Sequence, residues 1–179
     1  MTDTDRYNAA LDFATKKHEG QLRIGGAPYI THPVEVAAIL REKGYGTDYQ
    51  IAGLFHDLLE DTDATEQEIE ELGGKEVLTA VKLVTKKKGY IMADYIAGIK
   101  QNPIACAVKA ADRLHNLKSA VVADNDFKRR YILESIDWYL DFSPEIPQAV
   151  KALAETLDTP MYNLNLDYHT VKHDEPWRK

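Results

Sequence analysis

The chain has 179 residues with a single cysteine, and 29 acidic against 22 basic residues give a formal net charge of −7. That length suits one domain with its own core, and the acidic balance argues against nonspecific nucleic-acid binding, which needs a broad basic face. The lone Cys106 excludes a disulfide framework, and the start of the chain lacks the apolar stretch of a secretion signal. We therefore expect a cytoplasmic protein that does not span a membrane.

The first third of the chain has apolar residues at helical spacing, so we expect helices there. A first helix ends near His18, and the glycine-rich loop QLRIGGAPYI follows it. Pro33 suits the first turn of the next helix, which stops at Gly44. Thr47 and Gln50 then have the spacing of a capping box. They predict the start of a third helix, with one apolar face turned to the core.

The rest of the chain also has helical periodicity up to its last twenty residues. A second capping box, at Thr65 and Glu68, opens a short helix that Gly73 and Gly74 end. Further helices are expected over about residues 76–85 and 91–100, from Pro103 onward, through Tyr131 to Tyr139, and after a cap at Ser143. The tail differs, because apolar residues alternate with polar ones at Tyr162, Leu164, Leu166 and Tyr168. We predict an all-α fold, with a single compact helical bundle over residues 1–158 and an extended tail over residues 159–179.

Four potential metal ligands lie in three separated segments: His32, His56 with Asp57, and Asp112. Taken alone, a histidine before Pro33 is an ordinary helix start, and a histidine on an apolar helix face is usually a core residue. Imidazoles and carboxylates buried together are costly unless a cation or bases compensate them. Mixed nitrogen and oxygen ligands without thiolate suit Mn²⁺, Fe²⁺, Zn²⁺ or, more weakly, Mg²⁺. We predict one divalent-cation site.

Two further acids, Glu60 and Asp61, are expected on the helix that carries His56 and Asp57, one turn beyond them. A carboxylate beside a bound cation can hold or take the proton of an attacking water. We therefore expect these two acids to serve chemistry more than metal binding.

The same segments resemble the motifs of the HD phosphohydrolase superfamily, and within it the hydrolase domain of RelA/SpoT homologues and the small alarmone hydrolases. HEGQLRIGGAPYITHP is similar to the first motif, HDLLEDT to the second and VKAADRLHNL to the third. The match covers most of the chain, from His18 to about Tyr139. The resemblance implies an HD-domain bundle with Mn²⁺ held by His32, His56, Asp57 and Asp112, and catalysis by Glu60 and Asp61.

The resemblance also implies a reaction. It is the manganese-dependent hydrolysis of the ribose 3′-pyrophosphate of guanosine tetra- or pentaphosphate (ppGpp), which gives GDP or GTP and pyrophosphate. In the substrate site, the resemblance implies that Arg23 stacks on the purine and Asn116 contacts the ribose. A planar guanidinium suits stacking, and an amide suits hydroxyl groups.

One motif departs from the family pattern. Ile24 stands where the family usually has a lysine, and Gly25, Gly26 and Ala27 replace Ser-Gly-Glu. A basic group expected near the substrate phosphates is thereby lost. Other basic residues that would compensate are Lys86, Arg129 and Arg130, although each also suits an ordinary solvated position.

Two other functions fit the sequence. One is an HD phosphatase acting on another nucleotide, namely an adenine alarmone, the 2′-phosphate of NADPH or a nucleoside monophosphate. The other is a non-catalytic module that binds alarmones, against which Glu60 and Asp61 speak because extra acids repel an anionic ligand. In every case the expected partner is a small nucleotide rather than nucleic acid or membrane. The apolar edge of the tail would pack on its own domain or on a second subunit, so a homo-oligomer is one alternative.

Overall fold

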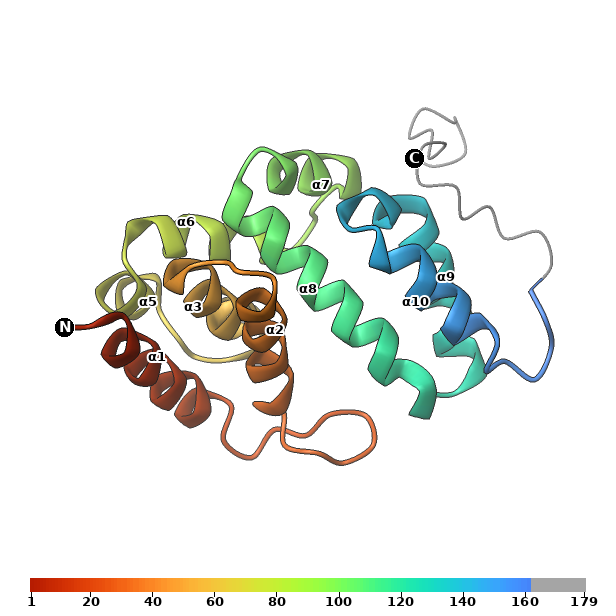
Figure 1. The fold of residues 1–179 in the computed structure, drawn as a ribbon, viewed down its shortest axis with the longest axis horizontal. Helices are drawn as coiled ribbons and strands as arrows, with labels where there is room; N and C mark the ends of the chain where they lie inside the picture. Colours follow the sequence, from red (N-terminus) through yellow and green to blue (C-terminus); the bar gives the residue numbers. More distant parts are fainter. Residues whose placement is uncertain (162–179) are drawn as a thin grey trace. The chain divides into compact units, whose positions relative to one another are not determined.

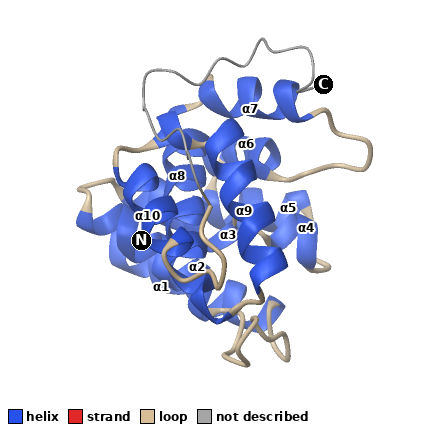
Figure 2. Cartoon of the chain, turned by 90° about the vertical axis from the view of Figure 1, so that its right-hand side faces the viewer, coloured by secondary structure: helices blue, strands red, loops and turns tan. Residues whose placement is uncertain are grey.

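The computed structural model describes residues 1–161, so the prediction of an extended tail, which rests on Tyr162, Leu164, Leu166 and Tyr168, lies outside the described residues. Every regular element over residues 1–161 is a helix, which confirms the all-α prediction (Figure 2). None of the helices in this part of the chain is long and apolar enough to cross a bilayer. The contacts divide the chain into two compact units, residues 1–112 and 113–179. The boundary expected at residue 158 stays a prediction.

The first unit contains seven helices and most of an eighth, drawn from red to green in Figure 1. They are α1 (Asp3–Lys17), α2 (Thr31–Glu42), α3 (Thr47–Phe55), α4 (Leu58–Asp61), α5 (Glu66–Gly73), α6 (Lys75–Val84), α7 (Met92–Lys100) and α8 (Pro103–Ser119). The predicted capping box of Thr65 and Glu68 is confirmed at the start of α5. Gly74, with a φ of 89° that favours glycine, ends the same helix as predicted for this glycine pair.

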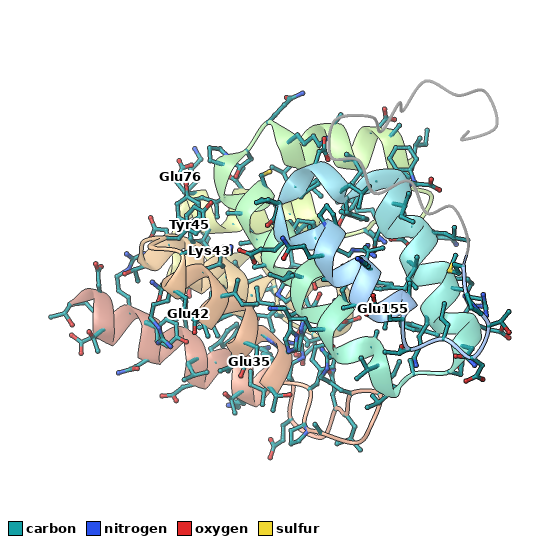
Figure 3. All side chains as sticks on the ribbon, turned by 45° about the vertical axis from the view of Figure 1, so that its right-hand side comes forward. Glu35, Glu42, Lys43, Tyr45, Glu76 and Glu155 are labelled. Atoms are coloured by element: carbon teal, nitrogen blue, oxygen red, sulfur yellow. The ribbon has the colours of Figure 1, made fainter. Side chains whose placement is uncertain are left out.

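Helices α2 and α3 pack side by side in the centre of the first unit (Figure 1). A glycine allows this close approach, because a Cβ atom built on Gly53 would lie 2.9 Å from Leu40 Cδ1 and 3.3 Å from Val36 Cγ1. Both of those side chains are fully buried. Acids such as Glu35 and Glu42 are exposed on α2, as Figure 3 shows. The sequence of α2 therefore fixes which face of the helix meets α3.

Two local predictions were wrong around α3. Thr47 is the first residue of the helix rather than its cap, which is Gly46, and Thr47 makes no capping hydrogen bond. The helix also ends at Phe55, so His56 and Asp57 lie in a turn before the short helix α4. The His56 ring donates from Nδ1 to the Gly53 carbonyl at 2.7 Å, and a carbonyl engaged by a side chain is a weaker partner for a continuing helix.

The second unit begins at Arg113, within α8, and continues through η1 (Ala120–Val122), α9 (Asn125–Trp138), η2 (Leu140–Phe142) and α10 (Glu145–Ala154). Its core is formed by Leu114 and Leu117 of α8 against Ile132, Ile146 and Val150. The cap predicted at Ser143 is placed one residue early, because Pro144 is the capping residue of α10. The Ser143 hydroxyl still accepts a hydrogen bond from the Glu145 amide, at 3.3 Å.

Candidate metal centre

Three side chains of the first unit converge at the buried ends of α2 and α3. His32 is in the first turn of α2, whereas His56 and Asp57 come from the turn after α3. His32 Nε2 and His56 Nε2 are 3.2 Å apart, and Asp57 Oδ2 lies 3.0 Å from the second nitrogen and 3.7 Å from the first. Each residue thus offers one ligand atom to the same small volume.

Asp112 of α8 approaches the same imidazoles. Its Oδ1 atom lies 3.0 Å from His32 Nε2 and 3.6 Å from His56 Nε2. The other carboxylate oxygen, Oδ2, accepts a hydrogen bond from Lys109 Nζ at 2.8 Å. Lys109 therefore fixes the carboxylate so that one oxygen faces the two histidines.

The electrostatics of the cluster favour added positive charge. Burial lowers the pKa of His56, but the charge of Asp57 and the hydrogen bond that the His56 ring donates to Asp112 outweigh it and raise this pKa to about 10. Burial raises the pKa of Asp57, and the charge of His56 then brings it down to about 2. Burial and the charge of His56 lower the pKa of His32, which disfavours a positive charge on both imidazoles at once.

A divalent cation fits this donor set. His32 and His56 are only 1% and 3% exposed, and their Nε2 atoms lie 3.2 Å apart. Ligands of one cation at bond lengths of about 2.1 Å are themselves about 3 Å apart, as these atoms are. The Gly53 carbonyl accepts from His56 Nδ1–H and leaves Nε2 for a cation, which is the usual outer support of a histidine ligand.

The two predicted acids lie beside this cluster, on α4. Glu60 and Asp61 are both exposed, unlike the buried histidines. Glu60 Oε2 accepts a hydrogen bond from the Lys86 amide at 2.9 Å, and Asp61 Oδ2 lies 3.4 Å from the Tyr29 hydroxyl. Partial burial and the charges of Asp57 and Glu60 raise the pKa of Asp61. The arrangement gives an accessible acid with raised proton affinity next to the cation site.

The loop between α1 and α2 brings Arg23 toward the same region. The loop is closed by hydrogen bonds from the Arg23 amide to the Ala27 carbonyl at 2.8 Å and from the Tyr29 amide to the Gln21 carbonyl at 2.9 Å. The Arg23 guanidinium lies 5.9 Å from the centre of the Tyr29 ring. Ile24, at the position where a lysine was expected, is 62% exposed.

Lys86 is the predicted phosphate-binding residue that the structure places near an acid of the site. It follows α6, and its ammonium group lies 5.3 Å from the centre of the Tyr90 ring and 5.7 Å from that of Tyr95. The Lys109 ammonium is 5.9 Å from the same Tyr95 ring. Two lysines therefore share the Tyr95 ring, and each also bonds an acid: Lys86 bonds Glu60 through its amide, and Lys109 bonds Asp112 through its ammonium group.

The remaining predicted substrate contacts belong to the second unit. Asn116 is half-buried on α8, one turn after Asp112 in the sequence. Arg129 Nη2 donates to the Thr159 carbonyl at 2.9 Å, and Arg130 is exposed on α9. Their roles in substrate binding stay predictions.

The sequence reasoning missed two residues that contact the cluster, Tyr29 and Lys109. The Tyr29 hydroxyl donates to Asp57 Oδ2 at 2.6 Å. Burial and the charge of Asp57 raise its pKa well above the usual value, so the phenol stays protonated and remains a donor. Lys109 was identifiable from its position three residues before Asp112, since that spacing places two side chains on one helix face. Tyr29 lies three residues before His32, in a loop whose path the sequence did not reveal.

The sequence and the fold of this chain resemble those of known proteins. Residues 10–93 match the family model of the HD domain. The chain is 36% identical over 151 residues to a GTP pyrophosphokinase of Myxococcus xanthus, an alignment that covers 76% of this chain and 20% of the relative. It is 37% identical over 145 residues to the bifunctional (p)ppGpp synthase/hydrolase SpoT of Escherichia coli, covering 75% of this chain and 21% of that protein. The chain thus spans about a fifth of the length of these curated relatives.

A solved structure has the same fold. It is described as a metazoan ortholog of SpoT that hydrolyzes ppGpp and plays a role in starvation responses. The likeness has a TM-score of 0.65 at 24% sequence identity, and it covers 93% of each chain. The family match includes α2, α3 and the turn that carries His56 and Asp57. The chain therefore carries a match to the HD domain over residues 10–93 and is similar in sequence to one part of SpoT and of the GTP pyrophosphokinases.

Proposed function

We propose that this protein is a metal-dependent nucleotide phosphohydrolase that removes the 3′-pyrophosphate of guanosine tetra- or pentaphosphate. The observation that carries the proposal is the convergence of His32, His56 and Asp57 on one buried point, with two further acids beside it. The sequence relation to SpoT, a bifunctional (p)ppGpp synthase/hydrolase, supports the substrate class. Cytoplasmic localisation and a homo-oligomer stay predictions.

The metal part of the proposal assigns His32, His56, Asp57 and Asp112 as the ligands, and Mn²⁺ as the ion. A cation there would supply Lewis acidity for attack of water on phosphorus. Nitrogen and carboxylate donors without thiolate suit Mn²⁺. Lys109 contributes by holding Asp112 with one oxygen toward the imidazoles, which keeps that ligand oriented in the absence of the ion.

The acids on α4 account for the proton transfers. We assign Glu60 and Asp61 to receive a proton from the attacking water and return one to the leaving ribose 3′-oxygen. The water oxygen becomes bonded to phosphorus as the bond between phosphorus and the 3′-oxygen breaks, so the products are the nucleotide 5′-di- or triphosphate and pyrophosphate. The raised pKa of Asp61 suits it to accepting a proton near neutral pH better than an ordinary aspartate.

We assign recognition of the substrate to basic residues near the cluster. Arg23 offers a planar cation for stacking on a purine, and Lys86 a point charge for a phosphate. We further assign Asn116 to the ribose and Arg129 and Arg130 to the phosphates. Because stacking barely distinguishes guanine from adenine, and because Ile24 supplies no charge, we expect moderate tolerance of the base.

The test is a nucleotide panel with the products separated. Purified protein loaded with Mn²⁺ should release pyrophosphate from guanosine tetraphosphate with a higher kcat/KM than it releases phosphate from NADPH or nucleoside monophosphates. Glu60→Gln should retain the metal and lose on the order of 10²-fold in turnover, whereas Glu35→Gln, an exposed acid on α2 (Figure 3), should behave as the wild type.

Each contrary result points to one alternative. Faster phosphate release from another nucleotide would identify a phosphatase of different specificity. Tight binding of guanosine tetraphosphate without turnover of any member of the panel would identify a non-catalytic alarmone-binding module. Loss of metal in Glu60→Gln would reassign Glu60 as a ligand.

A further inference from the structure

Tyr29 contacts both the cation site and the loop that carries Arg23. Its hydroxyl donates to Asp57 Oδ2 at 2.6 Å and lies 3.4 Å from Asp61 Oδ2. That same Asp57 oxygen is 3.0 Å from His56 Nε2. The hydroxyl group is therefore bonded to the carboxylate oxygen that faces the imidazoles, and it lies next to a second carboxylate from α4.

The ring of Tyr29 is held from several sides. The His18 ring lies against it, with ring centres 4.8 Å apart, and the His32 ring meets it edge-on at 6.0 Å. The Arg23 guanidinium lies 5.9 Å from its centre. This enclosure fixes the direction of the hydroxyl, because a tyrosine side chain has only two main rotatable bonds.

Gln21 ties the same loop to α4. Its side chain bonds His18 Nδ1 through Oε1 at 2.8 Å and donates from Nε2 to the Asp61 carbonyl at 2.8 Å. Its own carbonyl accepts the Tyr29 amide at 2.9 Å. The loop is therefore fixed to α4, and this keeps the Tyr29 hydroxyl close to both Asp57 and Asp61.

We propose that Tyr29 is a positioning residue with two separable roles, one for its hydroxyl and one for its ring. The hydroxyl holds Asp57 against the imidazoles and apart from Asp61, and the ring supports Arg23 for substrate binding. The inference rests on the proposed function, since it assumes that the cluster binds a cation. It adds a residue that the motif of histidines and aspartates does not include.

The hydroxyl role follows from the number of protons available. A phenol has one proton to donate, and the short bond goes to Asp57 while the contact to Asp61 is longer. Asp57 is thereby ordered as a ligand, and Asp61 keeps its oxygens for proton transfer. Outer hydrogen bonds of this kind typically account for 10- to 100-fold in metal affinity or activity.

The experiment separates the two roles with two substitutions. Tyr29→Phe removes the hydroxyl and keeps the ring, whereas Tyr29→Leu removes both. Tyr45→Phe is the matched control, because Tyr45 is an exposed tyrosine of the first unit, at the turn after α2, and its ring stacks on Tyr49 (Figure 3). For each protein, Mn²⁺ affinity is measured by calorimetry after chelator treatment, and KM and kcat are measured with guanosine tetraphosphate.

We expect Tyr29→Phe to weaken Mn²⁺ binding by about tenfold and to lower kcat, with KM for the nucleotide unchanged. Tyr29→Leu should weaken metal binding similarly and also raise KM, since Arg23 loses the ring beside it. Tyr45→Phe should match the wild type in all three quantities. Melting of the metal-free proteins, followed by circular dichroism, establishes that each variant is folded.

The contrary outcomes are distinct. Wild-type Mn²⁺ affinity in Tyr29→Phe would overturn the hydroxyl role while leaving the proposed function intact. An unchanged KM in Tyr29→Leu would overturn the ring role. Absence of metal binding by the wild-type protein would overturn both the inference and the proposed metal site.

Discussion

Two regions of this molecule bury charged side chains, and they satisfy them in different ways. In the first unit, the Nε2 atoms of His32 and His56 lie 3.2 Å apart, and each lies 3.0–3.7 Å from a carboxylate oxygen of Asp57 and of Asp112. In the second unit, Arg113 is 3% exposed and is paired with Glu134 at 2.7 Å. Its guanidinium lies 3.8 Å from the centre of the Tyr139 ring and 4.2 Å from that of Tyr131.

The difference shows which of the two regions calls for a ligand. The positive charge of Arg113 is compensated within the fold by one carboxylate and two aromatic faces. The cluster of histidines and aspartates instead gathers lone pairs, and in the absence of a cation a proton on His56 takes that place. A buried site that gathers lone pairs is a candidate for metal binding, whereas a compensated charge is a structural element.

The largest expected effect comes from removing a ligand of the cluster. His56→Ala should abolish Mn²⁺ binding and turnover, because His56 Nε2 lies 3.2 Å from His32 Nε2 and 3.0 Å from Asp57 Oδ2 and would be a ligand of the same cation. Metal at 100 times its Kd should stabilise the wild type by about 2.7 kcal/mol and this variant not at all. Elemental analysis and thermal melts with and without Mn²⁺ measure both. Equal metal content in the variant and the wild type would show that the cluster does not bind the metal.

The second largest expected effect is a loss of stability when the buried charge of Arg113 is removed. Arg113→Met should lower the free energy of unfolding by about 3 kcal/mol, because it deletes a buried ion pair and its aromatic contacts. The Glu134 side chain is 38% exposed, so the carboxylate that loses its partner returns to water and the loss stays at the low end. Denaturant melts should show the same metal-induced stabilisation as the wild type. If Mn²⁺ stabilised this variant less than the wild type, Arg113 would contribute to metal binding.

The smallest expected effect tests whether the close packing of α2 against α3 determines the positions of the ligands in the cluster. Gly53→Ala gains about 1 kcal/mol of helix propensity but overpacks Leu40 and Val36, which costs about 1–3 kcal/mol. We expect a net loss of about 1 kcal/mol with weaker Mn²⁺ binding, since α2 must move from α3. Gly98→Ala in α7 is the control, because its Cβ would meet only Leu83 Cδ2 at an ordinary 3.6 Å. If both variants were equally stable and bound metal equally, the close approach at Gly53 would have no role in the site.

The sequence alone determined the helical class and most boundaries. Capping patterns and glycines act within one or two turns of chain, so the start of α5 at Thr65 and its end at Gly74 were predictable. Pro103 opens α8 for the same local reason. The local signal failed at Thr47, where Gly46 takes the cap. It failed again at His56, where a side-chain bond to Gly53 ends the helix.

The chemistry of the site was readable because residue type limits it. Buried imidazoles and carboxylates have few stable uses apart from a cation, so His32, His56 and Asp57 could be named before their geometry was known. Only the tertiary structure decided which side chains surround them. Tyr29 and Lys109 reach the cluster because a closed loop and a helix face bring their donor groups to Asp57 and Asp112. Such contacts depend on the path of the chain through space, and no spacing pattern in the sequence indicates a hydrogen bond between Tyr29 and Asp57, which are 28 positions apart.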